Sequence, residues 1–101
     1  MARVSRELVK LVQELVSIPT PAGREDRLLP LVEKRLSRAG LSVRRQTVPG
    51  AGENILASRG EGGPLFLAHL DVFPAYEHPE AFTPRLQGTE LIGRGAVDTK
   101  G

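Results

Sequence analysis

The chain has 101 residues, of which 40% are apolar and 26% are charged, and its formal net charge is +2. This length is enough for one domain, and the composition is that of a folded globular protein rather than a disordered one. The small net charge, the scattered arginines and the few aromatic residues provide neither the basic patch nor the stacking surface that nucleic-acid binding requires.

The chain contains no cysteine, which excludes disulfides, thiolate metal ligands and cysteine nucleophiles. Residues 1–7 contain no apolar core of signal-peptide length. The longest apolar run is far shorter than the roughly 20 residues that span a bilayer. We therefore expect a cytoplasmic protein with no membrane association.

Two helices are predicted first. Over residues 5–17 the apolar residues recur at helical spacing, with Ser5 as the N-cap, and the helix should end before the proline-rich segment 18–23. A second helix is predicted from about residue 24 to 39, where Pro30 should kink it or delay its regular start and Gly40 should end it. The residues expected to be buried on this second helix are Leu28, Leu31, Val32 and Leu36.

Strands follow the helices. Residues 41–48 and 54–58 are predicted strands joined by a turn at 49–52, and residues 65–68 form an apolar run typical of a strand covered on both faces. A long irregular stretch, 72–84, precedes a small hairpin centred on Gly88. Two helices followed by several strands predict a layered α/β domain.

The first candidate for chemistry is the sequence His69-Leu70-Asp71, directly after the apolar run. The end of a buried strand is where α/β proteins place functional side chains, and in His-x-Asp both side chains can point to the same side. The carboxylate can then accept a hydrogen bond from one imidazole nitrogen and orient the other nitrogen toward a metal. A structural hydrogen-bonded pair is the alternative interpretation.

The second candidate is Asp98, within residues 93–101, whose sequence is Gly-Arg-Gly-Ala-Val-Asp-Thr-Lys-Gly. Its three glycines permit turns and close approaches, so a carboxylate here could reach a metal from another direction. The alternative is an exposed aspartate that caps a following helix. A phosphate-binding loop is not favoured, because the third glycine of one such pattern and the Gly-Lys-Ser/Thr ending of the other are missing.

Together the two segments resemble one family. An apolar run ending in His-Leu-Asp-Val, a proline-rich loop and then Gly-Arg-Gly-Ala-x-Asp-x-Lys-Gly, with 29 residues from His69 to Asp98, are similar to the acetylornithine deacetylases, succinyl-diaminopimelate desuccinylases, aminoacylases and glutamate carboxypeptidases. Residues 18–25 look like the family's usual "Ile-Pro-Ser-Pro-x-Gly-x-Glu" opening, and residues 39–41 and 54–57 match its next elements. Thr99 stands where the family more often has methionine.

The resemblance implies a fold and a site. The fold would be α/β: the amino-terminal part of a zinc-exopeptidase-like three-layer domain, with two helices followed by a mixed sheet. By the same resemblance, His69 is a ligand of one zinc ion, Asp98 bridges two zinc ions, and Asp71 is the catalytic-site residue that orients His69. Cobalt is the alternative metal. The expected substrate is a small N-acylated amino acid or short peptide, whose amide bond is hydrolysed.

The resemblance also implies that residues 1–101 are an incomplete catalytic domain. In the family the general base belongs to a Glu-Glu pair beyond the Asp-x-Lys-Gly segment, and the carboxy-terminal half and a lid domain complete the enzyme. We therefore expect the 101-residue chain to be inactive by itself. Glu77, His78 and Glu80 could fill in as ligands, but a solvated loop is the expectation there. The alternative function is a truncated, non-catalytic module that forms a homo-oligomer or binds a partner.

Overall fold

Helix α1, Arg6–Ser17, begins as the sequence predicts. The computed structural model describes residues 4–101, so residues 1–3, part of the segment in which no signal-peptide core is expected, lie outside the described residues. The Ser5 hydroxyl accepts a hydrogen bond from the Leu8 amide at 3.1 Å, which satisfies one of the free amides of the first turn. The helix ends at Ser17 because Pro19 disfavours helix at the residue before it.

The second helix starts later than residue 24. A short 3₁₀ turn, η1 (Glu25–Arg27), comes first, and the regular helix α2 runs over Leu29–Arg38 with Pro30 in its first turn. Proline is well tolerated there because the amide it lacks would have no partner in the helix. The delayed start predicted from Pro30 is therefore confirmed, and Gly40 follows the helix with φ +85°.

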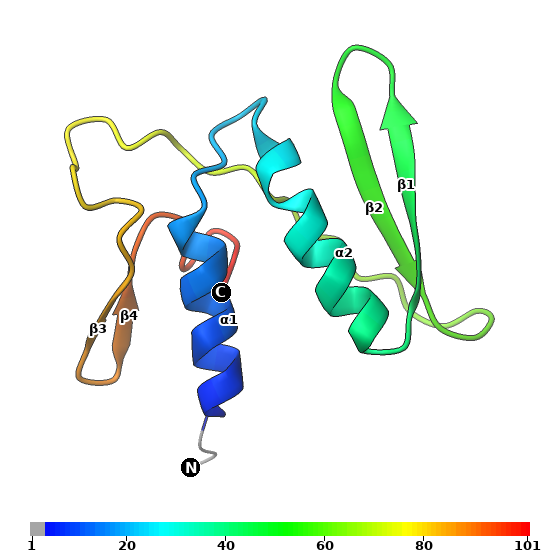
Figure 1. Ribbon diagram of the computed structural model, residues 1–101, viewed down its shortest axis with the longest axis horizontal. Coiled ribbons are helices and arrows are strands. Elements are labelled where there is room, and N and C mark those ends of the chain that lie inside the picture. The colour runs from blue at the N-terminus through cyan, green and yellow to red at the C-terminus, as the bar shows by residue number, and fades with distance from the viewer. Residues whose placement is uncertain (1–3) are drawn as a thin grey trace.

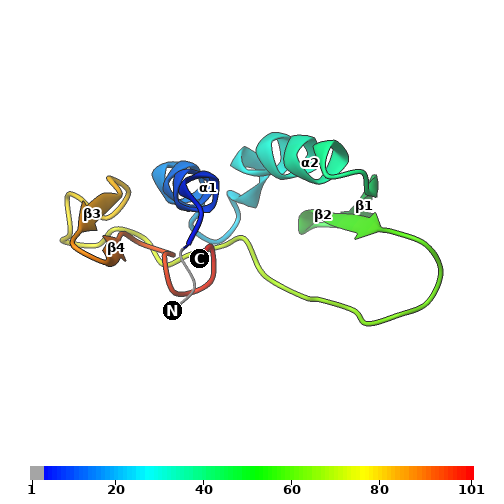
Figure 2. The same ribbon diagram turned by 90° about the horizontal axis from the view of Figure 1, so that it is seen from below.

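Two separate hairpins follow the helices. Strands β1 (Ser42–Val48) and β2 (Gly52–Ser58) pair antiparallel, and β3 (Arg85–Gln87) pairs antiparallel with β4 (Glu90–Ile92). Helix α2 lies along the first hairpin and the second hairpin lies on the other side of α1 (Figures 1 and 2). The predicted α/β class, with two helices followed by strands, is confirmed. The predicted mixed sheet is not observed among residues 4–101, because both sheets there are two-stranded and antiparallel. The parallel pairing in these residues is an isolated bridge between Pro21 and Val72.

The strand predicted at residues 65–68 is wrong for this chain. The segment pairs with no other strand among residues 4–101, and the side chains of Leu65, Phe66 and Leu67 are 85%, 91% and 91% exposed. A strand covered on both faces needs neighbouring strands at its edges and a layer of structure above and below. The described residues supply neither, so this apolar run remains exposed. It connects the first hairpin to the residues that lie beside the segment after α1 (Figure 1).

The chain exposes more surface than a closed domain of its size. Its accessible surface is 7918 Å², whereas folded monomers of this mass average about 5,600 Å². Its radius of gyration is 14.7 Å, against about 13 Å for a compact domain of this length. The buried apolar residues are few: Val16, Leu28, Leu29, Val72 and Ala81. In residues 4–101 no helix is long and apolar enough to cross a membrane.

Candidate metal centre

The structure brings His69, Asp71 and Asp98 together. The Nε2 atom of His69 lies 2.9 Å from Oδ1 of Asp98, although 29 residues separate them in sequence. The other ring nitrogen, Nδ1, lies 3.0 Å from the backbone carbonyl oxygen of Asp71 and 3.3 Å from Oδ1 of the same residue. Asp71 therefore contacts the imidazole as expected, with its backbone carbonyl as the nearer acceptor.

These contacts constrain the protons of the imidazole. An Nδ1–H that donates to the Asp71 carbonyl leaves the lone pair of Nε2 directed at the Asp98 carboxylate. Two acceptors 2.9 Å apart repel each other unless a cation lies between them, and without a metal that cation is a proton. The pKa of His69 is accordingly raised, first by the Asp71 backbone carbonyl and then by the hydrogen bond and negative charge of Asp98.

The same donor set fits a zinc ion in part. An imidazole nitrogen and a carboxylate oxygen are both common zinc ligands, and here they converge on one point with the imidazole already oriented through Nδ1. The side chains of His69 and Asp98 are 49% and 74% exposed, so both are open to a ligand. Over residues 4–101, however, no three histidine, aspartate or glutamate side chains cluster in a way that could hold a metal. The arrangement supplies two ligands, not a closed site.

A hollow of about 560 Å³ lies over these residues. It is lined by His69, Asp71 and Asp98, and by Pro21 and Ala22 of the proline-rich segment after α1. Two carboxylates facing one imidazole give this hollow a negative charge, which favours a cation. The hollow therefore places the two carboxylates and the imidazole beside a space open to solvent.

The glycines of residues 93–101 serve the close approach that the sequence suggested. At Gly95, which has φ +91°, a Cβ atom would lie 2.7 Å from Cγ1 of Val72. At Gly93 a Cβ atom would lie 2.5 Å from Cγ1 of Val16. Glycine at these two positions lets the loop pack directly on Val16 of α1 and on Val72. This packing places Asp98 beside His69.

Sequence reasoning missed two residues that support the site. Thr20 is fully buried and Lys100 is 7% exposed. The Thr20 hydroxyl donates to the Leu70 carbonyl, and the Lys100 ammonium donates to the carbonyls of Leu15 and Ile18. Burial lowers the pKa of Lys100 to about 8, so the ammonium is still mostly protonated at pH 7. The sequence did offer one indication of these two residues. Thr20 lies within Ile-Pro-Thr-Pro and Lys100 within Asp-Thr-Lys-Gly, the two segments that resemble the family, and both side chains can form hydrogen bonds.

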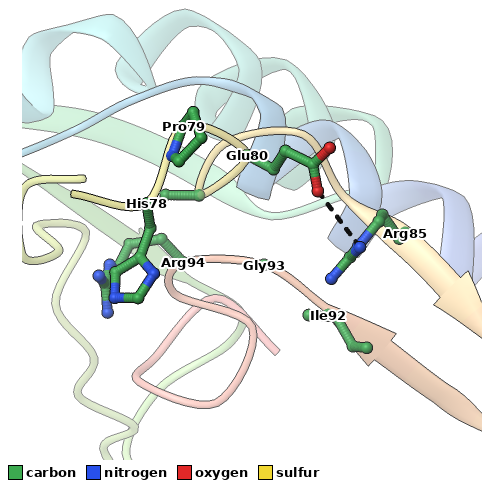
Figure 3. Close-up of a pocket in the computed structure, with 8 residues that line it drawn as sticks. His78, Pro79, Glu80, Arg85, Ile92, Gly93 and Arg94 are labelled. Carbon is green, nitrogen blue, oxygen red and sulfur yellow. Dashed lines mark ion pairs between the residues drawn. The ribbon is translucent and has the colours of Figure 1, made fainter. Parts of the chain in front are cut away.

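The loop with Glu77, His78 and Glu80 is exposed, as expected, and lies outside the hollow of His69. His78 and Glu80 line a different pocket of about 370 Å³, in which Glu80 is paired with Arg85 at 3.2 Å (Figure 3). In the same pocket, Nε of Arg94 is buried with no hydrogen-bond partner among the described residues. The two pockets share no residue, so this loop contributes nothing to the His69–Asp98 pair.

Comparison with known proteins agrees with the resemblance. No protein-family model matches the chain. A protein of Aeropyrum pernix, provisionally named a LysW-lysine/LysW-ornithine hydrolase, is 37% identical over 94 residues, which is 91% of this chain. The succinyl-diaminopimelate desuccinylases of Rhizorhabdus wittichii and Xanthobacter autotrophicus are 34% and 38% identical over 99 and 100 residues, in each case 90% of this chain.

The chain is thus similar to members of the amidohydrolase family that its two segments resemble. It is similar in particular to the succinyl-diaminopimelate desuccinylases and to the LysW-lysine/LysW-ornithine hydrolases within that family. It spans about a quarter of the length of these curated relatives: 25%, 26% and 27%.

Proposed function

We propose that this chain is the amino-terminal part of a co-catalytic dinuclear zinc hydrolase that cleaves the amide bond of small N-acyl amino acids or short peptides. In this proposal His69 is a ligand of one metal ion, Asp98 bridges the two ions and Asp71 orients His69. The observation that carries it is the 2.9 Å approach of His69 Nε2 to Asp98 Oδ1, with Nδ1 held by the Asp71 carbonyl. The substrate class is inferred from the names of the relatives.

The residues of this chain would hold and orient the metal. When bound, zinc, or cobalt in its place, polarises a carbonyl and makes a hydroxide available near neutral pH. His69 presents its Nε2 lone pair because Nδ1–H is held by Asp71, and Asp98 supplies the negative charge that a shared position between two cations needs. The proposal assigns the remaining ligands and the general base to a longer protein, and it places the enzyme in the cytoplasm.

The test uses the gene product at the length found in its native cells. Sequencing beyond the codon for Gly101 and measuring the intact mass establish that length. Metal analysis should then give about two zinc ions per chain, and hydrolysis of N-acyl amino acids should depend on them. His69→Ala and Asp98→Ala should remove zinc and activity. His78→Ala alters the other histidine of residues 1–101 and should change neither, so it is the matched control.

A second candidate function, self-association without catalysis, is favoured by the uncovered run at residues 65–67. An extended apolar segment without strand partners is a template for pairing with another chain. If the native mass agrees with 101 residues and the protein sediments as a stable oligomer without metal, the catalytic proposal is wrong for this chain. Replacing Phe66 with serine should then shift the oligomer toward monomer.

A further inference from the structure

Thr20 and Lys100 are the buried polar side chains of residues 4–101, with exposed fractions of 0% and 7%. They lie 80 positions apart in sequence, yet both make their hydrogen bonds around the carboxyl end of α1. One of them contacts the segment that carries His69, and the other belongs to the segment that carries Asp98. Burying a polar side chain costs free energy of folding unless the side chain is hydrogen-bonded. The hydrogen-bond partners of Thr20 and Lys100 therefore show which backbone segments these side chains hold in place.

Thr20 holds the His69 segment by two hydrogen bonds. Its hydroxyl donates to the carbonyl of Leu70 at 2.6 Å, midway between His69 and Asp71. Its own carbonyl accepts a hydrogen bond from the amide of Val72 at 2.8 Å. These two bonds fix the backbone on both sides of Asp71, and the same backbone supplies the carbonyl that orients the His69 ring.

Lys100 holds the Asp98 segment. Its Nζ atom donates to the carbonyls of Leu15 and Ile18, each at 2.9 Å, where the end of α1 leaves carbonyls without helical partners. Its backbone amide donates to the carbonyl of Gly95 at 2.7 Å, which closes the loop around Asp98. Lys100 therefore attaches this loop to the same short stretch, residues 15–20, that holds the other segment.

We propose that Thr20 and Lys100 are positioning residues that set the separation of His69 and Asp98 through the carboxyl end of α1. The inference rests on the proposed function, because the separation matters as the spacing of two metal ligands. Metal ligands must be held within a few tenths of an ångström, and the partners that orient them are worth roughly 10- to 100-fold in metal affinity. A purely structural role would lower stability without changing how the two ligands meet.

The experiment is a zinc titration of the chain followed by NMR. The imidazole signals of His69 report on the site, and those of His78, the only other histidine, serve as the reference within the same molecule. The variants are Thr20→Val and Lys100→Met, which remove the donors and keep similar shapes, and Thr20→Ser, which keeps the hydroxyl. Nuclear Overhauser contacts between the His69 ring and the Asp98 β-protons report the separation without metal.

Two control variants remove exposed side-chain hydrogen bonds to helix-end carbonyls, and neither bond involves a segment that carries His69 or Asp98. Ser17→Ala removes the hydroxyl that donates to the carbonyl of Glu14, at the same end of α1. Arg59→Met removes a cationic donor to the carbonyl of Ala39, at the end of the other helix. Each control therefore loses stabilisation of a helix end while the hydrogen bonds of Thr20 and Lys100 remain.

We expect Thr20→Val and Lys100→Met to weaken zinc binding at His69 at least about tenfold and to lose the His69–Asp98 contacts, while Thr20→Ser and both controls stay within about twofold. The inference is overturned if the two test variants keep the contacts and the wild-type affinity. If the wild-type chain shows no zinc response at His69, two ligands are not enough for measurable binding, and the metal assignment is then tested only on the longer gene product, since the proposed function places the remaining ligands there. The nuclear Overhauser contacts between the His69 ring and the Asp98 β-protons, measured without metal, then still test the positioning role. If Thr20→Val does not fold, Lys100→Met alone tests it.

Discussion

Replacing Gly93 with alanine should destabilise the chain by forcing a methyl group into α1. A Cβ atom at this position would lie 2.5 Å from Cγ1 of Val16, whereas carbon atoms in van der Waals contact are about 3.5–4.0 Å apart. Val16 is fully buried, so it cannot swing away into solvent. Because Gly93 is not among the glycines with positive φ, this contact alone sets the cost, and overpacking of this kind costs about 1–3 kcal/mol.

A double-mutant cycle with Val16→Ala tests this explanation. Val16→Ala alone should cost about 2 kcal/mol, because it removes two buried methyl groups and leaves a cavity. In the double variant the new methyl group of residue 93 occupies part of that cavity. The double variant should therefore be more stable than the sum of the single changes implies, by about 1–2 kcal/mol. The free energies come from urea unfolding followed by circular dichroism, with the slopes compared between variants.

Gly95 provides the contrast. Its Cβ atom would lie 2.7 Å from Cγ1 of Val72, but its backbone also has φ +91°, which is strained for any residue with a side chain. Val72→Ala should relieve the contact and not the strain, so Gly95→Ala should remain destabilising by at least about 1 kcal/mol in that background. A Gly93→Ala variant as stable as wild type, or a cycle at Gly93 with no coupling, would refute the packing argument.

Four further predictions concern the site, the first helix and the uncovered run. The folded state raises the pKa of His69 above its usual 6.5, so the stabilisation from the protonated ring is complete below about pH 6.5 and is lost as the pH rises through the higher folded value. Thermal melts of the metal-free chain should show this decline in stability, and Asp98→Asn should make the decline smaller. Zinc competes with the same proton, so zinc affinity measured by calorimetry should rise with pH over that range. Ser5→Ala should lower the free energy of unfolding by about 1 kcal/mol in urea, and an unchanged value would contradict the capping role. Phe66→Ser should raise solubility without lowering the melting temperature, since Phe66 is 91% exposed and packs on nothing that the mutation would lose.

The helix ends and the hairpins could be predicted from the sequence because they depend on interactions between residues close together in the chain. The cap at Ser5 and the late start of α2 at Pro30 each depend on hydrogen bonds or steric contacts within a few residues. The hairpins around residues 49–51 and around Gly88 likewise follow from turn residues between strand-forming ones. For the same reason the pairing of His69 with Asp71 was expected, although the nearer acceptor is the backbone carbonyl rather than the carboxylate.

The prediction that failed depended on neighbours. An apolar run such as residues 65–68 indicates that the segment should be buried, but it does not identify the strands or helices that would bury it. The described chain offers no strand beside it and no layer on either face, so the segment stays exposed and the two hairpins remain separate sheets.

By itself the sequence predicted the helices, the hairpins, the resemblance to a family and the residues expected to hold a metal. Only the tertiary structure decided that His69 and Asp98 meet at 2.9 Å, because 29 intervening residues give the chain no local means of setting that distance. It is set by packing and by buried hydrogen bonds from Thr20 and Lys100 to backbone atoms far away in sequence, and the spacing of residue types along the chain does not reveal those partners.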